Sequence, residues 1–188
     1  MGRPSNREQR RAELVAAFAR VMADHGYAGA TIAAVAAQAG MAPGLVHHHF
    51  ENKAELLMAL LQSLVTGFRQ RVDAYQAHDD PLLAYVDAAL RLDERSDLVA
   101  AKCWVGVFAE AVRDPALFAQ MRRLVDSEIG SIVTRSRHRL SDQEAGSVLA
   151  FIIGSLVLGA FAPRKTAGFA APGLRRLIAA MRPASKDQ

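Results

Sequence analysis

The chain has 188 residues, of which 51% are hydrophobic and 22% are charged, so it can bury a substantial core and is neither a disordered nor a fibrous protein. Its formal net charge of +4 favours anionic partners, although an excess of this size also occurs on proteins that bind nothing acidic. The single cysteine, Cys103, excludes an internal disulfide and a cysteine-based zinc site, and it fits a reducing compartment.

Positive charge is concentrated at the start of the chain. Four arginines lie there against one acid: Arg3, Arg7, Arg10 and Arg11 against Glu8. A signal peptide would continue as an uninterrupted apolar run, but charges recur at Glu13, Arg20 and Asp24. We therefore expect a cytoplasmic protein.

Apolar residues recur at helical spacing along the whole chain, and no segment shows the sustained alternation of a strand. The fold is therefore predicted to be all-α, with about nine helices. Gly26 and Gly40 end the first two helices, and Thr31 is a plausible N-cap for the second. The first four helices are expected over about 6–25, 31–39 and 43–49, and from 53 into the seventies.

Later helix starts are marked by their caps. Asp80-Pro81 and Asp114-Pro115 each place an N-cap before a proline at the first helical position. Ser141 to Glu144 has the spacing of a capping box. The later helices are expected to begin near Pro81, Ser96, Pro115, Asp142 and Pro172, with Pro163 closing the fourth of them and the last ending before Pro183.

Three consecutive histidines, His47 to His49, raise the question of a metal or catalytic site. Adjacent residues of a helix point about 100° apart, so three neighbouring imidazoles cannot converge on one ion. The i, i+4 spacing of helical metal ligands is absent, and the local sequence offers no partner to orient a catalytic histidine. We expect no metal, no cofactor and no catalytic residue.

The spacing around the histidines fits a helix-turn-helix. Ala36 is a small residue where two helices can touch, Gly40 can form the turn, and Val46 can anchor the second helix. Such a motif presents the start of its second helix to the major groove of DNA while nearby positive charge neutralises phosphates. The arginines of the first helix and Lys53 would supply that charge.

The segment GYAGATIAAVAAQAGMAPGLVHHHFENKAELL, residues 26–57, resembles the TetR family of bacterial transcriptional regulators. The matching features are a glycine-aromatic pair, a threonine opening the second helix, a glycine in the turn, and a lysine three residues after Phe50. The likeness spans about Arg7 to Leu61. It implies a homodimeric, ligand-responsive repressor that binds a palindromic operator, with a DNA-binding domain over 1–50 and an effector-binding and dimerisation domain over 51–188.

The resemblance also implies roles for single residues toward DNA. Thr31 and Lys53 would contact phosphates, with Arg3 and Arg7 adding positive charge. The residues in or beside the groove would be Ala42, Pro43, Gly44 and Leu45. His47 stands where the family usually has tyrosine, and it either contacts a phosphate or only covers the helix surface. His48 either reaches bases or is solvated, whereas His49 and Phe50 are expected to pack between helices.

The stretch CWVGVFAEAVRDPALF, residues 103–118, is similar to the BetI-type branch of the family. Trp104 and Phe108 share a helix face and could help to form an apolar cavity, although ordinary core packing is the stronger explanation for each residue taken singly. The predicted effector contacts are Leu64, Phe68, Tyr85, Trp104, Phe108, Glu110 and Met121. Glu110 would favour a cationic ligand, or is solvated. The resemblance suggests choline or a related quaternary ammonium, but a shared fold does not name the effector.

Residues 145–162 carry no charge and reach the lower length limit of a membrane span. Gly146, Ala150 and Gly154 recur every four positions, so another helix could approach closely. A helix buried at a subunit interface explains the pattern equally well. The predicted interface residues are Gly146, Ala150, Ile153, Gly154, Val157, Leu158, Phe161, Leu174, Leu177 and Ile178.

Two other classes of function remain open at this point. A ligand-independent architectural DNA-binding protein would need no cavity. A helical enzyme is not supported, because the sequence offers no paired carboxylates, nucleophile motif or phosphate loop.

Overall fold

The computed structural model describes residues 6–74, 79–90, 95–166 and 168–181. Within these ranges the chain forms ten helices and no strand, which confirms the predicted all-α fold. The helices are α1 (Asn6–Gly29), α2 (Ile32–Ala39), α3 (Pro43–His49), α4 (Lys53–Ala74), α5 (Pro81–Leu90), α6 (Arg95–Ala111), α7 (Pro115–Arg135), α8 (Asp142–Phe161), α9 (Pro163–Thr166) and α10 (Ala170–Met181). The sequence predicted about nine helices, and the one that it did not predict is the single turn α9.

Glycines form the turns among the first helices. Gly26 has φ 71° and ψ 173°, so α1 is kinked there, where the sequence predicted its end. Gly40 ends α2 in the left-handed conformation, with φ 65°, which a residue with a β-carbon adopts only under strain. At the start of α2 the Thr31 hydroxyl accepts a hydrogen bond from the Ala34 amide.

Helices α7 and α8 begin at the predicted caps, whereas α10 begins at Ala170, two residues before the predicted start at Pro172. The Asp114 carboxylate accepts hydrogen bonds from the amides of Ala116 and Leu117 at the start of α7. Ser141 and Glu144 form a complete capping box at the start of α8. These caps satisfy amides that have no partner inside their own helix.

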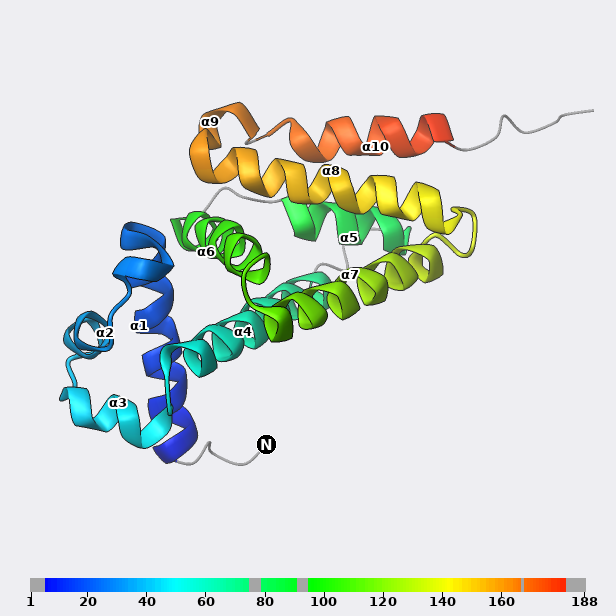
Figure 1. Cartoon of the computed structure of the whole chain (residues 1–188). Coiled ribbons are helices and arrows are strands. Elements are labelled where there is room, and N and C mark those ends of the chain that lie inside the picture. The colour runs from blue at the N-terminus through cyan, green and yellow to red at the C-terminus, as the bar shows by residue number, and fades with distance from the viewer. Residues whose placement is uncertain (1–5, 75–78, 91–94, 167, 182–188) are drawn as a thin grey trace, which may run out of the picture.

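Helices α1–α3 form a head, and the remaining helices form a body (Figure 1). Helix α4 runs out of the head along the body, and α8 and α10 lie side by side at the far edge. Helix α6 packs against both α1 and α8, so it joins the head to the centre of the body. One cluster of buried side chains spans α1–α4, α6 and the start of α7, and a second spans α5, α7, α8 and α10.

Helix α8 is, among the described residues, the one helix long and apolar enough to cross a membrane. It packs against α5, α6, α7 and α10 of the same chain, and Val148, Leu149 and Ile152 are buried in the second cluster. It therefore forms part of the core of this chain.

Candidate nucleic-acid interface and ligand cavity

Helix α3 has a buried anchor and an exposed opposite face. Val46 is fully buried against the head, where Ala36 of α2 is also buried. The outward residues of the turn and of α3 are all exposed: Ala42, Pro43, Gly44, Leu45, His47 and His48. The predicted groove residues thus share one accessible surface. His49 and Phe50 are buried, as predicted.

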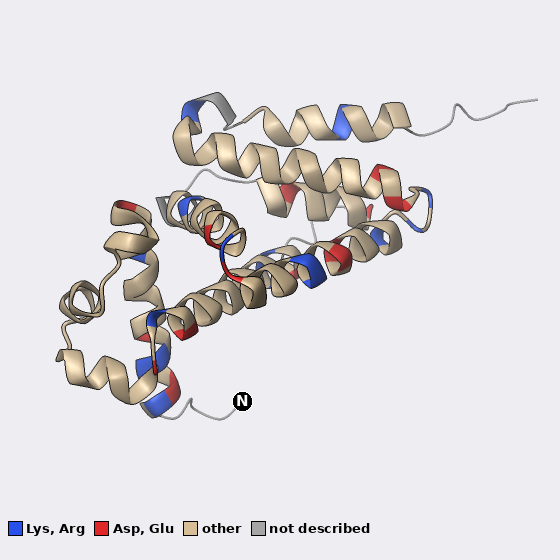
Figure 2. Cartoon of the chain, in the orientation of Figure 1, with Lys and Arg blue, Asp and Glu red and all other residues tan. Residues whose placement is uncertain are grey.

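Helices α2 and α3 carry no Lys, Arg, Asp or Glu, and the charges near them lie at the start of α1 and at the junction of α3 and α4 (Figure 2). Arg7 and Arg10 are exposed there, whereas Arg3 lies outside the described residues. The exposed Thr31 accepts a hydrogen bond from its helix and keeps its hydroxyl hydrogen available to a phosphate.

Lys53, which was expected to meet a phosphate, has partners inside the head. Its ammonium donates to the carbonyl oxygens of Tyr27 at 2.8 Å and Ala28 at 3.4 Å. It also lies 4.2 Å from the centre of the Tyr27 ring. Lys53 therefore holds the start of α4 to the end of α1, and its phosphate contact stays a prediction.

Arg11 is half-buried, and its guanidinium contacts other groups of the protein. Its guanidinium donates to the carbonyl of His49 and to the carboxylate of Glu55, and it lies 4.0 Å from the centre of the Phe50 ring. Sequence reasoning counted Arg11 only as positive charge, because contacts between residues far apart in the chain leave no local pattern.

His49 is the buried member of the histidine triplet. Its Nδ1 has no hydrogen-bond partner among the described residues. Burial lowers the pKa of this imidazole, and the neighbouring His48, Arg7, Arg11 and Arg10 lower it further. A neutral ring at this position suits the core of the head.

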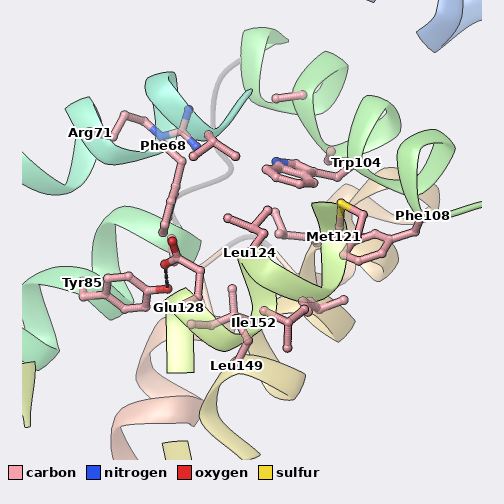
Figure 3. A pocket seen from close by; sticks show the side chains of 17 residues that line it. Phe68, Arg71, Tyr85, Trp104, Phe108, Met121, Leu124, Glu128, Leu149 and Ile152 are labelled. Carbon is pink, nitrogen blue, oxygen red and sulfur yellow. Dashed lines mark hydrogen bonds between the residues drawn. The ribbon is translucent and has the colours of Figure 1, made fainter. Parts of the chain in front are cut away.

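An apolar cavity opens between helices α4 to α8 (Figure 3). Aromatic rings form much of its wall, and those of Trp104 and Phe108 are 6.1 Å apart. Five predicted contact residues line it: Phe68, Tyr85, Trp104, Phe108 and Met121. The other two predicted contacts, Leu64 and Glu110, are not among the lining residues.

The acid in the cavity is Glu128. The Tyr85 hydroxyl donates to it at 2.8 Å, and burial together with this carboxylate raises the pKa of Tyr85 (Figure 3). Arg69 also approaches Glu128 at 3.8 Å. Glu110 instead lies 3.5 Å from Arg113, one helical turn away. Sequence reasoning missed Glu128, although it follows Met121 by two helical turns and so lies on the same face of α7.

The residues assigned to a dimer interface fall into three groups in the structure. Five are exposed: Ala150, Gly154, Leu158, Phe161 and Leu177. Gly146, Ile153 and Val157 are half-buried, and Ile153 lines the cavity.

Leu174 and Ile178 require a correction. Both are buried within the chain, in the cluster that α10 forms with α5 and α8. The apolar face of α10 is therefore used inside the protomer, and these two side chains are not accessible to a second copy.

Comparison with known proteins agrees with this architecture. The family model described as bacterial regulatory proteins, tetR family, matches residues 14–60. An HTH-type transcriptional regulator BetI from Paraburkholderia phytofirmans is 32% identical over 161 residues, which cover 81% of this chain and 82% of the relative.

Solved structures show the same fold. The crystal structure of a transcriptional regulator from Rhodococcus sp. Rha1 has a TM-score of 0.81 and 22% identity, and the match covers 91% of this chain and 95% of that one. A regulator from Saccharomonospora viridis in complex with choline has a TM-score of 0.71 and 19% identity, covering 92% of this chain and 96% of that one. Because the BetI relative is this similar over most of both sequences, the chain belongs to the TetR family of bacterial regulatory proteins, which are transcriptional regulators and not enzymes.

Proposed function

We propose that the chain is a cytoplasmic, homodimeric repressor that binds a palindromic operator and leaves it when a small molecule enters the cavity. One observation carries the proposal: helix α4 begins directly after the short turn that ends α3, and further along it lines the cavity with Phe68. A ligand that displaces α4 at the cavity would therefore also displace α3.

The surface of α3 suits shape and methyl recognition more than hydrogen-bond readout. Ala42, Pro43, Gly44 and Leu45 have no side-chain donors or acceptors, so contacts with thymine methyl groups and with DNA shape would select the operator. Thr31 and Arg7 would position the head on phosphates. His47 and His48 are the exposed side chains of α3 that can donate hydrogen bonds there.

A homodimer would pair the exposed apolar side chains of α8 and α10. Two copies of α3 must lie about 34–36 Å apart to enter successive major grooves on one side of the duplex. An effector would change this separation through α4, and a coupling of about 1–3 kcal/mol already changes affinity about 5–150-fold.

The cavity is lined by one acid, Glu128, and one base, Arg71, so the effector class is open between cationic, anionic and neutral apolar molecules. Aromatic rings attract cations, and the cavity holds the carboxylate of Glu128. That carboxylate already has partners in Tyr85 and Arg69, which reduces its pull on a ligand. The choline complex of the Saccharomonospora viridis regulator makes choline a reasonable first probe.

The test begins with duplexes that the purified protein selects from a random library. A repressor of this kind enriches a palindrome, and a ligand screen then identifies molecules that quench Trp104, the single tryptophan, and release the duplex. If the protein binds selected and random duplexes equally, the operator proposal fails. If it binds a palindrome but no ligand ever releases it, a ligand-independent architectural role replaces the sensor role.

A further inference from the structure

Arg11 joins the head to the start of α4. From α1, its guanidinium donates one hydrogen bond to the carbonyl of His49, the last residue of α3, and another to Glu55 of α4 at 2.7 Å. Its Cζ also lies 4.0 Å from the centre of the Phe50 ring. One side chain therefore contacts α3, the turn after it and α4.

Glu55 closes the same turn from the other side. Its second carboxylate oxygen accepts a hydrogen bond from the amide of Glu51 at 2.8 Å. The Glu55 amide in turn donates to the side chain of Asn52 at 2.9 Å. The hydrogen bond from Arg11 holds the pKa of Glu55 below its usual range, so the carboxylate stays charged at neutral pH.

Helix α3 needs such support. It has seven residues, and helices this short do not persist in water without tertiary contacts. The last carbonyls of a helix have no internal partner and carry partial negative charge, so a guanidinium at that end stabilises it. Val46 and His49 are the residues that α3 buries.

Glu55 and the cavity lie on the same helix. The thirteen residues from Glu55 to Phe68 span about 20 Å of α4 at about 1.5 Å per residue. A rigid displacement of α4 at the cavity therefore reaches Glu55, and through Arg11 it reaches the end of α3.

We propose that Arg11 and Glu55 form a clamp that makes α3 follow α4, so that Arg11 serves DNA binding as a positioning residue and not as a phosphate contact. The functional part of this inference rests on the proposed operator binding. The structural part concerns the free protein and is measured without DNA.

Glu55→Gln separates the clamp from simple electrostatics. Removing a negative charge near DNA should leave affinity unchanged or increase it, because DNA repels carboxylates. The clamp instead predicts weaker binding, by about fivefold or more, to a duplex selected by the wild-type protein. Fluorescence anisotropy at fixed ionic strength measures the difference, and circular dichroism confirms that the variant is folded.

Helix α1, which carries Arg11, also offers a matched control. Arg10 pairs with Glu13 at 2.9 Å within α1, and both side chains are exposed. Glu13→Gln removes the same charge without touching α3 or α4, so it should not weaken DNA binding. Arg11→Lys is an independent variant that keeps the charge but loses the forked geometry of the guanidinium. It should weaken DNA binding without changing the slope of log affinity against log salt concentration. Arg7→Ala, in contrast, should lower that slope by about one.

Hydrogen exchange tests the clamp whether or not the protein binds DNA. Glu55→Gln and Arg11→Lys should speed amide exchange in α3, and Glu13→Gln should not. Unchanged exchange in α3, or tighter DNA binding by folded Glu55→Gln, overturns the clamp. A wild-type protein that selects no duplex overturns the operator proposal instead, while faster exchange in the variants still supports the structural clamp.

Discussion

His49 places an ionisable ring in the core of the head, with its Nδ1 unpaired among the described residues. Its pKa in the folded protein lies below the ordinary value of about 6.5, because of burial and the positive charge of Arg7, Arg11, Arg10 and, when protonated, His48. The folded state therefore binds fewer protons at this site than the unfolded state does. The contribution of His49 to the free energy of unfolding is therefore fully present above about pH 6.5 and is lost as the pH falls below that value.

We expect the free energy of unfolding of the wild-type protein to decrease more steeply between about pH 7 and pH 5 than that of a His49→Gln variant. Urea unfolding at each pH measures the two slopes. His25 is exposed on α1, so His25→Gln is the matched control and should keep the wild-type slope. Equal slopes for His49→Gln and the wild type would show that the buried ring does not titrate in this range.

Single residues mark the limit of what the sequence predicts about the sites. Aromatic residues at helical spacing indicated the wall of the cavity, because periodicity places Trp104 and Phe108 on one face of α6. Periodicity alone does not decide whether Glu110 or Glu128 is the acid of the cavity, because that depends on how α6 and α7 are rotated about their axes. Lys53 shows the same limit: its spacing fits a phosphate contact, but its partners are carbonyls of α1.

Helices α1 and α6 pack closely at one small residue. A β-carbon on Gly106 would meet the terminal methyl group of Met22, which is buried on α1. Nearby, the Cys103 thiol donates to the carbonyl of Ala19 at 3.3 Å, and burial raises the pKa of this thiol to about 12. The cavity residues of α6 lie on the other side of this contact.

Gly106→Ala should therefore have two opposing effects on the free energy of unfolding. The added methyl group costs about 1–3 kcal/mol where Met22 fills the space, and replacing glycine in a helix interior gains about 1 kcal/mol. Met22→Ala empties this space. In that variant, Gly106→Ala should therefore raise the free energy of unfolding by about 1–3 kcal/mol more than it does in the wild-type protein. Thermal or urea unfolding of the two single variants and the double variant gives the interaction free energy.

A matched glycine tests whether the effect belongs to the contact. Gly67 of α4 has open space around a hypothetical β-carbon, so Gly67→Ala should stabilise the protein equally with or without Met22. Additive effects of Gly106→Ala and Met22→Ala would show that the Met22 methyl group moves aside without cost.

At the scale of elements, sequence prediction succeeded where the chemistry is local. Thr31, Asp114 and Ser141 each cap a helix through their own side chains, so the starts of α2, α7 and α8 follow from short stretches. Pro163 was expected to close α8 and does so, but it also opens the single turn α9. Proline fits the first turn of a helix as well as the end of one, so the residue alone does not decide.

The whole molecule adds information that no single helix contains. Helix α10 is amphipathic, and its apolar residues suited either a partner subunit or this chain. In the structure Leu174 and Ile178 are buried in the core beside α5, whereas Leu177 is exposed. Which face turns inward follows from the packing of α5 and α8, so the sequence could predict an apolar stripe but not its occupant.

What remains exposed on α8 and α10 leads to the last prediction. Leu158 is 59% exposed, Phe161 77% and Leu177 46%, and exposed large apolar side chains on two neighbouring helices suit an interface. In a twofold dimer each residue occurs twice at the interface, so one charged substitution places two unpaired charges there. Burying such charges costs several kcal/mol each, which exceeds what a small interface can offset.

Phe161→Glu is therefore expected to convert the proposed dimer into a monomer of 20.3 kDa in sedimentation equilibrium and to abolish cooperative binding to the proposed palindrome. Phe118→Glu is the control, because Phe118 is also exposed, at 55%, but lies on α7. The control should stay dimeric with unchanged circular dichroism. If Phe161→Glu stays dimeric while Phe118→Glu dissociates, the two copies meet through the surface of α7, and the spacing of the α3 helices must be derived from that arrangement.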